Sequence, residues 1–308
     1  GDVAAGVRAA EGRARVTDGA KTAAVSFGDR LAGVFAERGR LCVGIDPHAH
    51  LLTDWGLSAS ADGVREFGLR AVEAVAGRAG IVKPQVAFFE RYGSAGYAAL
   101  EDVLRAARAA GLLVIADGKR GDIGTSVASY AEAWLTPGSP LEADALTVAA
   151  FQGVGSLDEP MRLAEETGKG LFVLAATSNP EAAIVQQAVV ADGPRAGTTV
   201  ARAIIEDVHA FNQAQPPHPF GTVGLVLGAT VALGDYGIDT AVAVDPAFPV
   251  LAPGFGHQGA KVEDVRRLFG AFAPGVIVSE SRGLLSAGPD RLAEAVSRRA
   301  EEVRASHG

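Results

Sequence analysis

The sequence is poor in cysteine and in long apolar runs. Its single cysteine, Cys42, rules out a disulfide within the chain and fits a reducing cytoplasm. No apolar run approaches the roughly 18 residues that a membrane-spanning helix needs. The first residues also lack the apolar stretch of a signal peptide. We therefore expect a cytoplasmic protein with no membrane partner.

Basic residues are also in the minority. The chain has 28 Lys and Arg against 36 Asp and Glu, a formal net charge of −8 and a pI near 5.3. This balance argues against nucleic acid as a partner, and an anionic substrate would need a local basic pocket. With 48% hydrophobic and 21% charged residues, the 308-residue chain has the composition of a globular protein with a sizeable core.

Eight short apolar runs recur along the chain: Leu41 to Ile45, Ile81 to Lys83, Leu112 to Ala116, Ala145 to Val148, Leu171 to Ala175, Val223 to Leu227, Val250 to Ala252 and Val276 to Val278. Most are separated by an amphipathic stretch, such as Val64 to Ala76, Ala98 to Ala110, Val127 to Trp134 and Val262 to Phe272. Strands that alternate with helices indicate a parallel sheet covered on both faces. Eight such units in about 260 residues predict an α/β fold, a single eight-stranded β/α (TIM) barrel.

The pattern also sets the expected domain boundaries. Residues 1–25 show little sustained apolar periodicity, and we interpret them as an N-terminal extension that is flexible or vector-derived. Residues 26–308 form the barrel domain, which begins with a helix over Phe27 to Arg38. The longest connection, Ser178 to Phe220, carries two helical stretches and is a candidate lid.

Polar residues gather at the ends of the predicted strands. Seven of them lie at or just beyond the C-terminal ends of the apolar runs: Asp46, Lys83, Asp117, Lys119, Thr147, Ser178 and Glu280. Active sites of β/α barrels form at that end of the strands. We therefore expect these side chains to surround one site.

The stretch Leu112 to Ser126 is the most informative, because five apolar residues run directly into charge. Strand alternation places Asp117 and Lys119 on one face, and Gly121 allows a turn that brings Asp122 nearby. A lysine held between two carboxylates stays protonated, so it is a poor nucleophile and a good proton donor. The alternative interpretation is a salt-bridged strand end that only orders a loop.

A glycine-rich segment follows the seventh run. Gly254, Gly256 and Gly259 satisfy G-x-G-x-x-G, with Glu280 about 20 residues on, as in a dinucleotide-binding fingerprint. Only 28 residues follow Glu280, too few to complete a doubly wound sheet. In a barrel the loops after strands seven and eight instead form a phosphate site, which Gln258 and Arg282 would suit. A plain glycine-rich turn beside a surface arginine remains the alternative.

The stretch around Lys119 resembles the active-site signature D-x-K-x-x-D-I of orotidine 5'-monophosphate decarboxylases. The chain carries it as Asp117, Lys119, Asp122 and Ile123. Further similar stretches, especially to the longer bacterial, mycobacterial-type branch, are Leu41 to His48, Val82 to Phe89, Ala176 to Pro180, Pro253 to Gly259 and Ser281 to Leu284. The resemblance runs from about Ser26 to the C-terminus. One departure is Ala149, Ala150 and Phe151, where relatives in this branch often read N-P-Y.

The resemblance implies a reaction and a set of roles. It implies conversion of orotidine 5'-monophosphate to uridine 5'-monophosphate and carbon dioxide without a cofactor, by a homodimer with shared active sites. The catalytic residues would be Lys119 as proton donor with Asp117, Asp122 and Lys83, and Asp122 would reach into the partner's site. The implied substrate-binding residues are Asp46 on the ribose, Ser178 on the pyrimidine ring, Gln258 and Arg282 on the phosphate, and Thr125, Gly254 and Gly259.

Other interpretations stay open from the sequence. Asp46 could cap a turn, and Ser178 could cap a helix before Pro180. His48 and His50 lack the further ligands of a metal site, so none is expected. The chain could be a magnesium-dependent sugar-phosphate lyase or decarboxylase of the same superfamily, or a nucleotide-binding sensor without activity. A sensor has no need of a proton donor, which argues against the last alternative.

Overall fold

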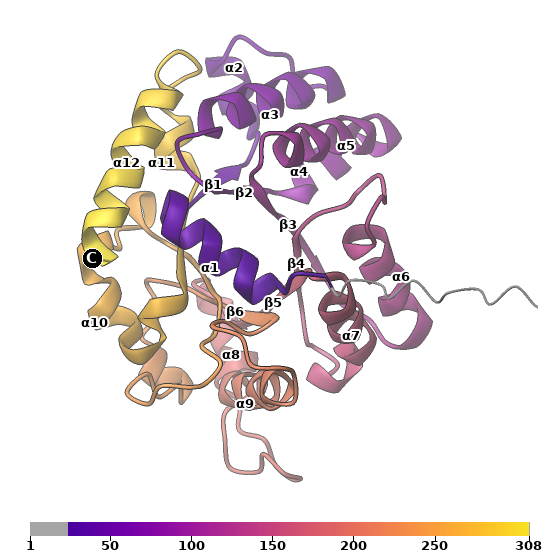
Figure 1. Ribbon diagram of the computed structural model, residues 1–308, viewed down its shortest axis with the longest axis vertical. Coiled ribbons are helices and arrows are strands. Elements are labelled where there is room, and N and C mark those ends of the chain that lie inside the picture. Colours follow the sequence, from indigo (N-terminus) through magenta and orange to yellow (C-terminus); the bar gives the residue numbers. More distant parts are fainter. Residues whose placement is uncertain (1–23, 308) are drawn as a thin grey trace, which may run out of the picture.

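The computed structural model describes residues 24–307 (Figure 1). Within them, parallel strands pair in sequence order and the eighth pairs with the first, which closes the barrel. The strands are β1 (Leu41–Ile45), β2 (Ile81–Pro84), β3 (Leu113–Arg120), β4 (Ala145–Val148), β5 (Gly170–Ala176), β6 (Val223–Leu227), β7 (Val250–Pro253) and β8 (Val276–Glu280). Each predicted run overlaps one strand, so the predicted barrel is confirmed.

Helices surround the barrel and close one of its ends (Figure 1). They are α1 (Phe27–Arg38), α2 (Ala49–Asp54), α3 (Ala61–Val75), α4 (Val86–Glu90), α5 (Gly93–Ala109), α6 (Gly124–Leu135), α7 (Asp158–Thr167), α8 (Ala183–Gln186), α9 (Val200–Gln213), α10 (Val265–Phe269), α11 (Arg282–Leu285) and α12 (Leu292–His307). The prediction for α1 is confirmed at both ends, and the side chain of Ser26 caps this helix by accepting the Asp29 N–H at 3.0 Å.

The single helix predicted over Val262 to Phe272 is wrong. The segment consists of a 3₁₀ turn (Val262–Asp264), the short helix α10, and a second 3₁₀ stretch (Gly270–Gly275). Gly270 has φ +50°, a left-handed conformation that ends the α-helix. The apolar periodicity of the segment is real, because Val262, Val265 and Phe269 are all buried, but it does not fix the helix type.

The long connection between β5 and β6 contains two helices, α8 and α9, as predicted. Its role as a lid stays a prediction. Of the proposed N-terminal extension, residues 1–23 lie outside the described residues. Within residues 24–307, no helix combines the length and the apolar character needed to cross a membrane.

Two apolar clusters build the molecule. The larger one lies between the strands and the surrounding helices. The smaller one draws residues from α1 and from every strand, so it fills the barrel interior; its strand members are Cys42, Ile81, Leu113, Ile115, Ala145, Phe172, Val226, Leu251 and Ile277. Burial raises the pKa of the Cys42 thiol to about 12, which makes it an inert core group.

Helix α1 closes the N-terminal end of this interior cluster (Figure 1). Phe27 and Leu31 are fully buried, and the Phe27 ring meets that of Phe172 edge to face at a centroid distance of 6.0 Å. Gly170 makes the approach possible, since a Cβ there would lie 2.6 Å from the Phe27 ring. The interior is thus sealed at one end by apolar packing.

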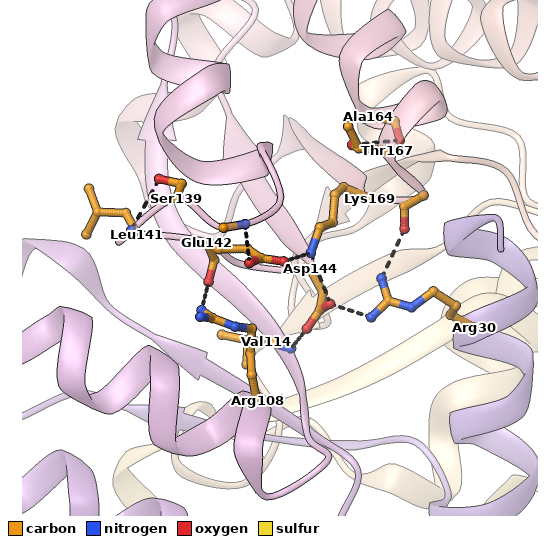
Figure 2. Close-up of polar contacts among 12 residues, drawn as sticks. Arg30, Arg108, Val114, Ser139, Leu141, Glu142, Asp144, Ala164, Thr167 and Lys169 are labelled. Carbon is orange, nitrogen blue, oxygen red and sulfur yellow. Dashed lines mark hydrogen bonds and ion pairs between the residues drawn. The ribbon is translucent and has the colours of Figure 1, made fainter. Parts of the chain in front are cut away.

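An ion-pair network fastens α1 to the barrel (Figure 2). Arg30 pairs with Asp144 and donates to the carbonyl of Gly168 at 3.0 Å. Asp144 also accepts the backbone N–H of Val114 at 2.8 Å, and Lys169 lies 3.6 Å from its carboxylate. Because this end is closed, access to the interior is left to the C-terminal ends of the strands.

Candidate active site

Polar side chains continue the interior face of the barrel toward its C-terminal end. On three strands, an apolar residue that faces the barrel interior is followed two positions later, on the same face, by a polar one. These pairs are Ile81 and Lys83, Ile115 and Asp117, and Ala145 and Thr147. All three polar side chains are buried. The alternation that builds the core therefore also places the charged groups.

Asp117 is the centre of this group, and it accepts four hydrogen bonds. Its Oδ2 accepts from Lys83 Nζ at 2.8 Å and Gln85 Nε2 at 3.0 Å. Its Oδ1 accepts from Lys119 Nζ at 2.6 Å and Thr147 Oγ1 at 2.8 Å. A carboxylate with two donors on each oxygen is held in one orientation.

The charges in this group support one another. Burial alone would raise the pKa of the Asp117 carboxyl, but the ammonium groups of Lys83 and Lys119 outweigh it and hold that pKa well below its usual range. Burial alone would lower the pKa of Lys83, but the carboxylates of Asp117 and Asp46 raise it overall. Asp117 and Lys83 are therefore both ionised at neutral pH, although both are buried.

Lys119 differs from Asp117 and Lys83 in the exposure of its side chain and in its backbone conformation. Its side chain is 47% exposed, whereas those of Asp117 and Lys83 are about one-tenth exposed. It has φ +47° and is the one non-glycine residue of the described chain with a positive φ. The prediction that Asp117 and Lys119 share a face is confirmed by their 2.6 Å ion pair.

These groups border a cavity of about 570 Å³. All seven polar strand-end residues predicted to surround one site line it, and so do the predicted residues Gly254, Gln258 and Arg282. Two polar atoms of its lining, Asp46 Oδ1 and Ser281 Oγ, are buried without a hydrogen-bond partner in the described chain. Because an unsatisfied buried polar atom costs about 1–3 kcal/mol, both atoms suit ligand groups that bring their own hydrogen bonds.

Asp122 is not brought to Lys119 within one chain. Its Oδ1 accepts the backbone N–H of Ile123 at 2.8 Å, and neither Asp122 nor Thr125 is among the cavity-lining residues of the described chain. The expectation of a second carboxylate beside Lys119 is therefore wrong for a single chain. The strand β3 ends at Arg120, and none of the residues that follow it before β4 lines the cavity in the described chain.

The glycine-rich segment after β7 forms one wall of the cavity. Gly254, Gly256 and Gly259 all have left-handed φ values, of +114°, +68° and +99°. Beside this segment, Arg282 Nη1 lies 2.8 Å from His257 Nε2. A guanidinium has no acceptor, so His257 Nε2 accepts this hydrogen bond, and the remaining N–H groups of Arg282 can bind an anionic group. Of the predicted residues here, Gly259 does not line the cavity.

The dinucleotide interpretation of the glycines is wrong. The segment lies between two strands of a closed barrel, not at the start of a doubly wound sheet. Glu280, which would bind a ribose in that interpretation, pairs with Arg299 of α12, with Arg299 Nε 2.6 Å from Glu280 Oε1. A Cβ on Gly256 would lie 3.0 Å from the Glu280 carboxylate, so this glycine makes room for the ion pair.

Sequence reasoning missed several residues of the site. Gln85 was not predicted, although it stands two residues after Lys83 and alternation would have placed it on the same face. His257 and Ser281, like Gln85, lie within the longer stretches that resemble the family, but no local signal marked them as site residues. His48 borders the cavity but stacks on His50, with ring centroids 5.4 Å apart. Among residues 24–307, no group of three or more His, Cys, Asp or Glu side chains is arranged to hold a metal ion.

Comparison with known families gives a consistent match. Residues 39–296 match the model of the orotidine 5'-phosphate decarboxylase / HUMPS family. The chain is 50% identical over 268 residues to the orotidine 5'-phosphate decarboxylase of Salinispora tropica, which covers 87% of this chain and 92% of that one. It is also 50% identical over 283 residues to the enzyme of that name from Nocardioides sp., covering 91% and 99%.

Solved structures agree with this match. A crystal structure from Streptomyces avermitilis, assigned as an orotidine 5'-phosphate decarboxylase, is 47% identical with a TM-score of 0.84, covering 92% of this chain and 96% of that one. The structure of Leishmania donovani OMP decarboxylase is 30% identical with a TM-score of 0.67, covering 91% and 99%.

Proposed function

The chain belongs to the orotidine 5'-phosphate decarboxylase / HUMPS family, and from this premise we propose how its cavity carries out the reaction. That reaction is the decarboxylation of orotidine 5'-monophosphate to uridine 5'-monophosphate, a carboxy-lyase step of pyrimidine biosynthesis. The observation that carries the proposed mechanism is the ion pair of the cavity-facing Lys119 with the buried Asp117.

Lys119 is the proton donor in this proposal. Breaking the bond between ring carbon six and the carboxylate releases carbon dioxide and leaves the electron pair on that carbon. A fixed ammonium beside the carbon stabilises this charge as it develops. One N–H bond of Lys119 then breaks as the new C–H bond forms, and the neutral amine regains a proton from water.

Asp117 has two roles in this proposal. Its carboxylate, which accepts four hydrogen bonds, fixes the position of the Lys119 ammonium. It also stays ionised beside the carboxylate of the substrate. Two like charges about 4 Å apart repel by roughly 4 kcal/mol at an effective dielectric of 20, and loss of carbon dioxide relieves this repulsion. Lys83 completes the charge network, since it neutralises the far side of Asp117.

The remaining cavity residues position the nucleotide. The unpartnered Asp46 Oδ1 is suited to a ribose hydroxyl, and Ser178 to the polar edge of the pyrimidine ring. Gln258 and Arg282 hold the phosphate, with Gly254 and Gly259 shaping the turn beside it. Binding the phosphate far from the reacting carbon supplies energy for orienting the ring, so these residues affect turnover as well as affinity.

We further propose a homodimer with shared active sites. Asp122 and Thr125 lie outside their own cavity, which leaves them available to a partner. Large apolar side chains are exposed nearby, with Ile123 61%, Tyr130 40% and Phe151 83% exposed. In a two-fold dimer, Asp122 and Thr125 of one chain would complete the partner's cavity. Phe151 is part of the Ala149 to Phe151 segment, which differs from the sequence of relatives in this branch. In the dimer this difference would change the interface and leave the charged residues around Asp117 unchanged.

The proposal assigns no nucleic acid or membrane partner, since the net charge is −8. It places the enzyme in the cytoplasm, where its one cysteine, buried in the barrel, stays reduced.

The test is turnover of the substrate in the presence of a chelator. Loss of the orotate absorbance is followed when the protein meets orotidine 5'-monophosphate with excess EDTA. We expect full activity under these conditions. Activity that EDTA removes and magnesium restores, or turnover of a sugar phosphate in place of the nucleotide, would transfer the chain to the magnesium-dependent relatives of the superfamily.

A further inference from the structure

Among the hydrogen bonds of residues 24–307, those of Thr147, near the end of β4, are the ones that join the side chain of Asp117 to the backbone of Lys119. Thr147 is 1% exposed. Its hydroxyl donates to Asp117 Oδ1 at 2.8 Å and accepts the backbone N–H of Lys119 at 3.0 Å. A hydroxyl has one proton, so its donation to Asp117 orients its lone pairs toward the Lys119 N–H.

The strand register explains why Lys119 needs this acceptor. On β3 and β4, Ala116 pairs with Leu146 and Arg120 pairs with Val148, with a register shift between them. Three residues of β3 therefore stand opposite Thr147 alone. The shift takes Lys119 out of the regular ladder, and the Thr147 hydroxyl accepts its N–H instead.

Lys119 also holds a costly backbone conformation. A left-handed conformation costs a non-glycine residue free energy and persists only where the surroundings over-determine it. The contacts form a closed ring: Lys119 N–H to Thr147 Oγ1, Thr147 O–H to Asp117 Oδ1, and Lys119 Nζ back to the same Oδ1. The ring ties the lysine's backbone to its own ammonium through two buried groups.

We propose that Thr147 is a positioning residue for the decarboxylation, which holds Lys119 in its left-handed conformation and thereby aims the Lys119 ammonium at the reacting carbon. The inference rests on the proposed function, because it gives a role to Thr147 only if Lys119 is the proton donor. Thr147 acts through Lys119 and Asp117 and has no bond to the substrate in this account. Its loss should therefore change turnover far more than affinity.

The experiment compares Thr147→Val, which keeps the shape and removes the hydroxyl, with Thr147→Ser, which keeps the hydroxyl. We expect Thr147→Val to lower kcat about 100-fold, the effect of a small misplacement of a reacting group. KM and product binding should change little, and the thermal midpoint should fall modestly, because the backbone N–H of Lys119 loses its acceptor. Thr147→Ser should recover kcat to within about threefold of wild type. If the valine variant fails to fold, Thr147→Cys, with a weak hydrogen-bonding sulfur, should give an intermediate kcat.

Gln85→Met is the matched control, because Gln85 donates to the other oxygen of Asp117 and makes no contact with the Lys119 backbone among the described contacts. It should cost less kcat than Thr147→Val. Three outcomes would each overturn the inference: Thr147→Val activity within twofold of wild type, a loss of kcat in Gln85→Met as large as in Thr147→Val, or failure of Thr147→Ser to recover kcat. A wild-type protein inactive on the nucleotide would instead overturn the proposed function itself.

Discussion

Lys83 and Asp117 face each other across neighbouring strands, with Lys83 Nζ 2.8 Å from Asp117 Oδ2 and both side chains about nine-tenths buried. A buried ion pair of this kind loses much stability when one partner is removed, because the other charge is left uncompensated. Here the Asp117 carboxylate forms ion pairs with both Lys83 and Lys119. The stability of the barrel and the proposed chemistry of the site therefore depend on the same ionised group.

The first prediction concerns acid stability. The pKa of Asp117 lies below its unfolded value of 3.8, so the stability it contributes is present above that pH and is lost as pH falls through the lower folded pKa. Asp117→Asn should lower the free energy of unfolding by about 3 kcal/mol near neutral pH. Denaturant titrations should show this difference constant from about pH 5 to pH 8 and shrinking below about pH 4. A difference that does not change with pH would contradict the assigned ionisation.

The second prediction separates phosphate binding from chemistry. Gln258→Ala and Arg282→Ala should each raise KM for the nucleotide about tenfold or more, since a hydrogen bond to a charged group contributes about 1.5–3 kcal/mol. The slow reaction of the nucleoside that lacks the phosphate should be unchanged in both variants. Steady-state kinetics on the two substrates measure this. If both substrates were affected equally, the two residues would be structural.

The third prediction concerns the ion-pair network below the barrel (Figure 2). Arg30→Met removes one of the two cationic partners of the buried Asp144, and we expect it to lower the free energy of unfolding by about 2 kcal/mol. Turnover should be unchanged, because the network lies at the closed end. Arg162→Met is the matched control: its pair with Glu159 is exposed and should contribute less than about 0.5 kcal/mol. Reduced kcat in Arg30→Met would show that the two ends are coupled.

The fourth prediction tests the shared site. Lys119→Ala and Asp122→Asn proteins, each inactive alone, are unfolded together and refolded at equal concentration. Two-fold pairing gives mixed dimers in which one site has both lesions and the other has neither. With random pairing, about a quarter of all sites should be intact, and activity should recover toward that fraction. Verified subunit exchange without recovery would show that Asp122 acts within its own chain.

The parts of the site that depend on strand alternation could be predicted from the sequence. Lys83 and Asp117 each stand two residues after an apolar residue of the barrel interior. A closed parallel barrel brings such positions together regardless of the conformation of the loops. The strands themselves were marked by apolar runs, and three of these, Leu41 to Ile45, Leu112 to Ala116 and Val250 to Ala252, end directly before a carboxylate or a proline. For the same reason, the cavity contains nearly all of the predicted polar residues.

The rest could not be predicted, because it depends on inter-strand register and backbone conformation. Lys119 lies within the register shift between β3 and β4 and has a left-handed backbone, and Asp122 beyond the end of β3 does not line the cavity. No residue pattern on β3 alone encodes which β4 residue it will pair with. The break in the helix predicted over Val262 to Phe272 is a similar case, since the left-handed Gly270 ended an element whose apolar period continued.

The most direct test of the account is the turnover of Lys119→Ala and of Lys119→Met, which keeps more of the side chain's length. The rate of orotate loss at saturating nucleotide is measured beside product binding and the thermal midpoint. Because the account assigns to this ammonium both charge stabilisation and proton transfer, kcat should fall by about 10⁴-fold or more while both variants stay folded and bind the product. A folded variant that retains activity within about tenfold of wild type would contradict Lys119 as the proton donor.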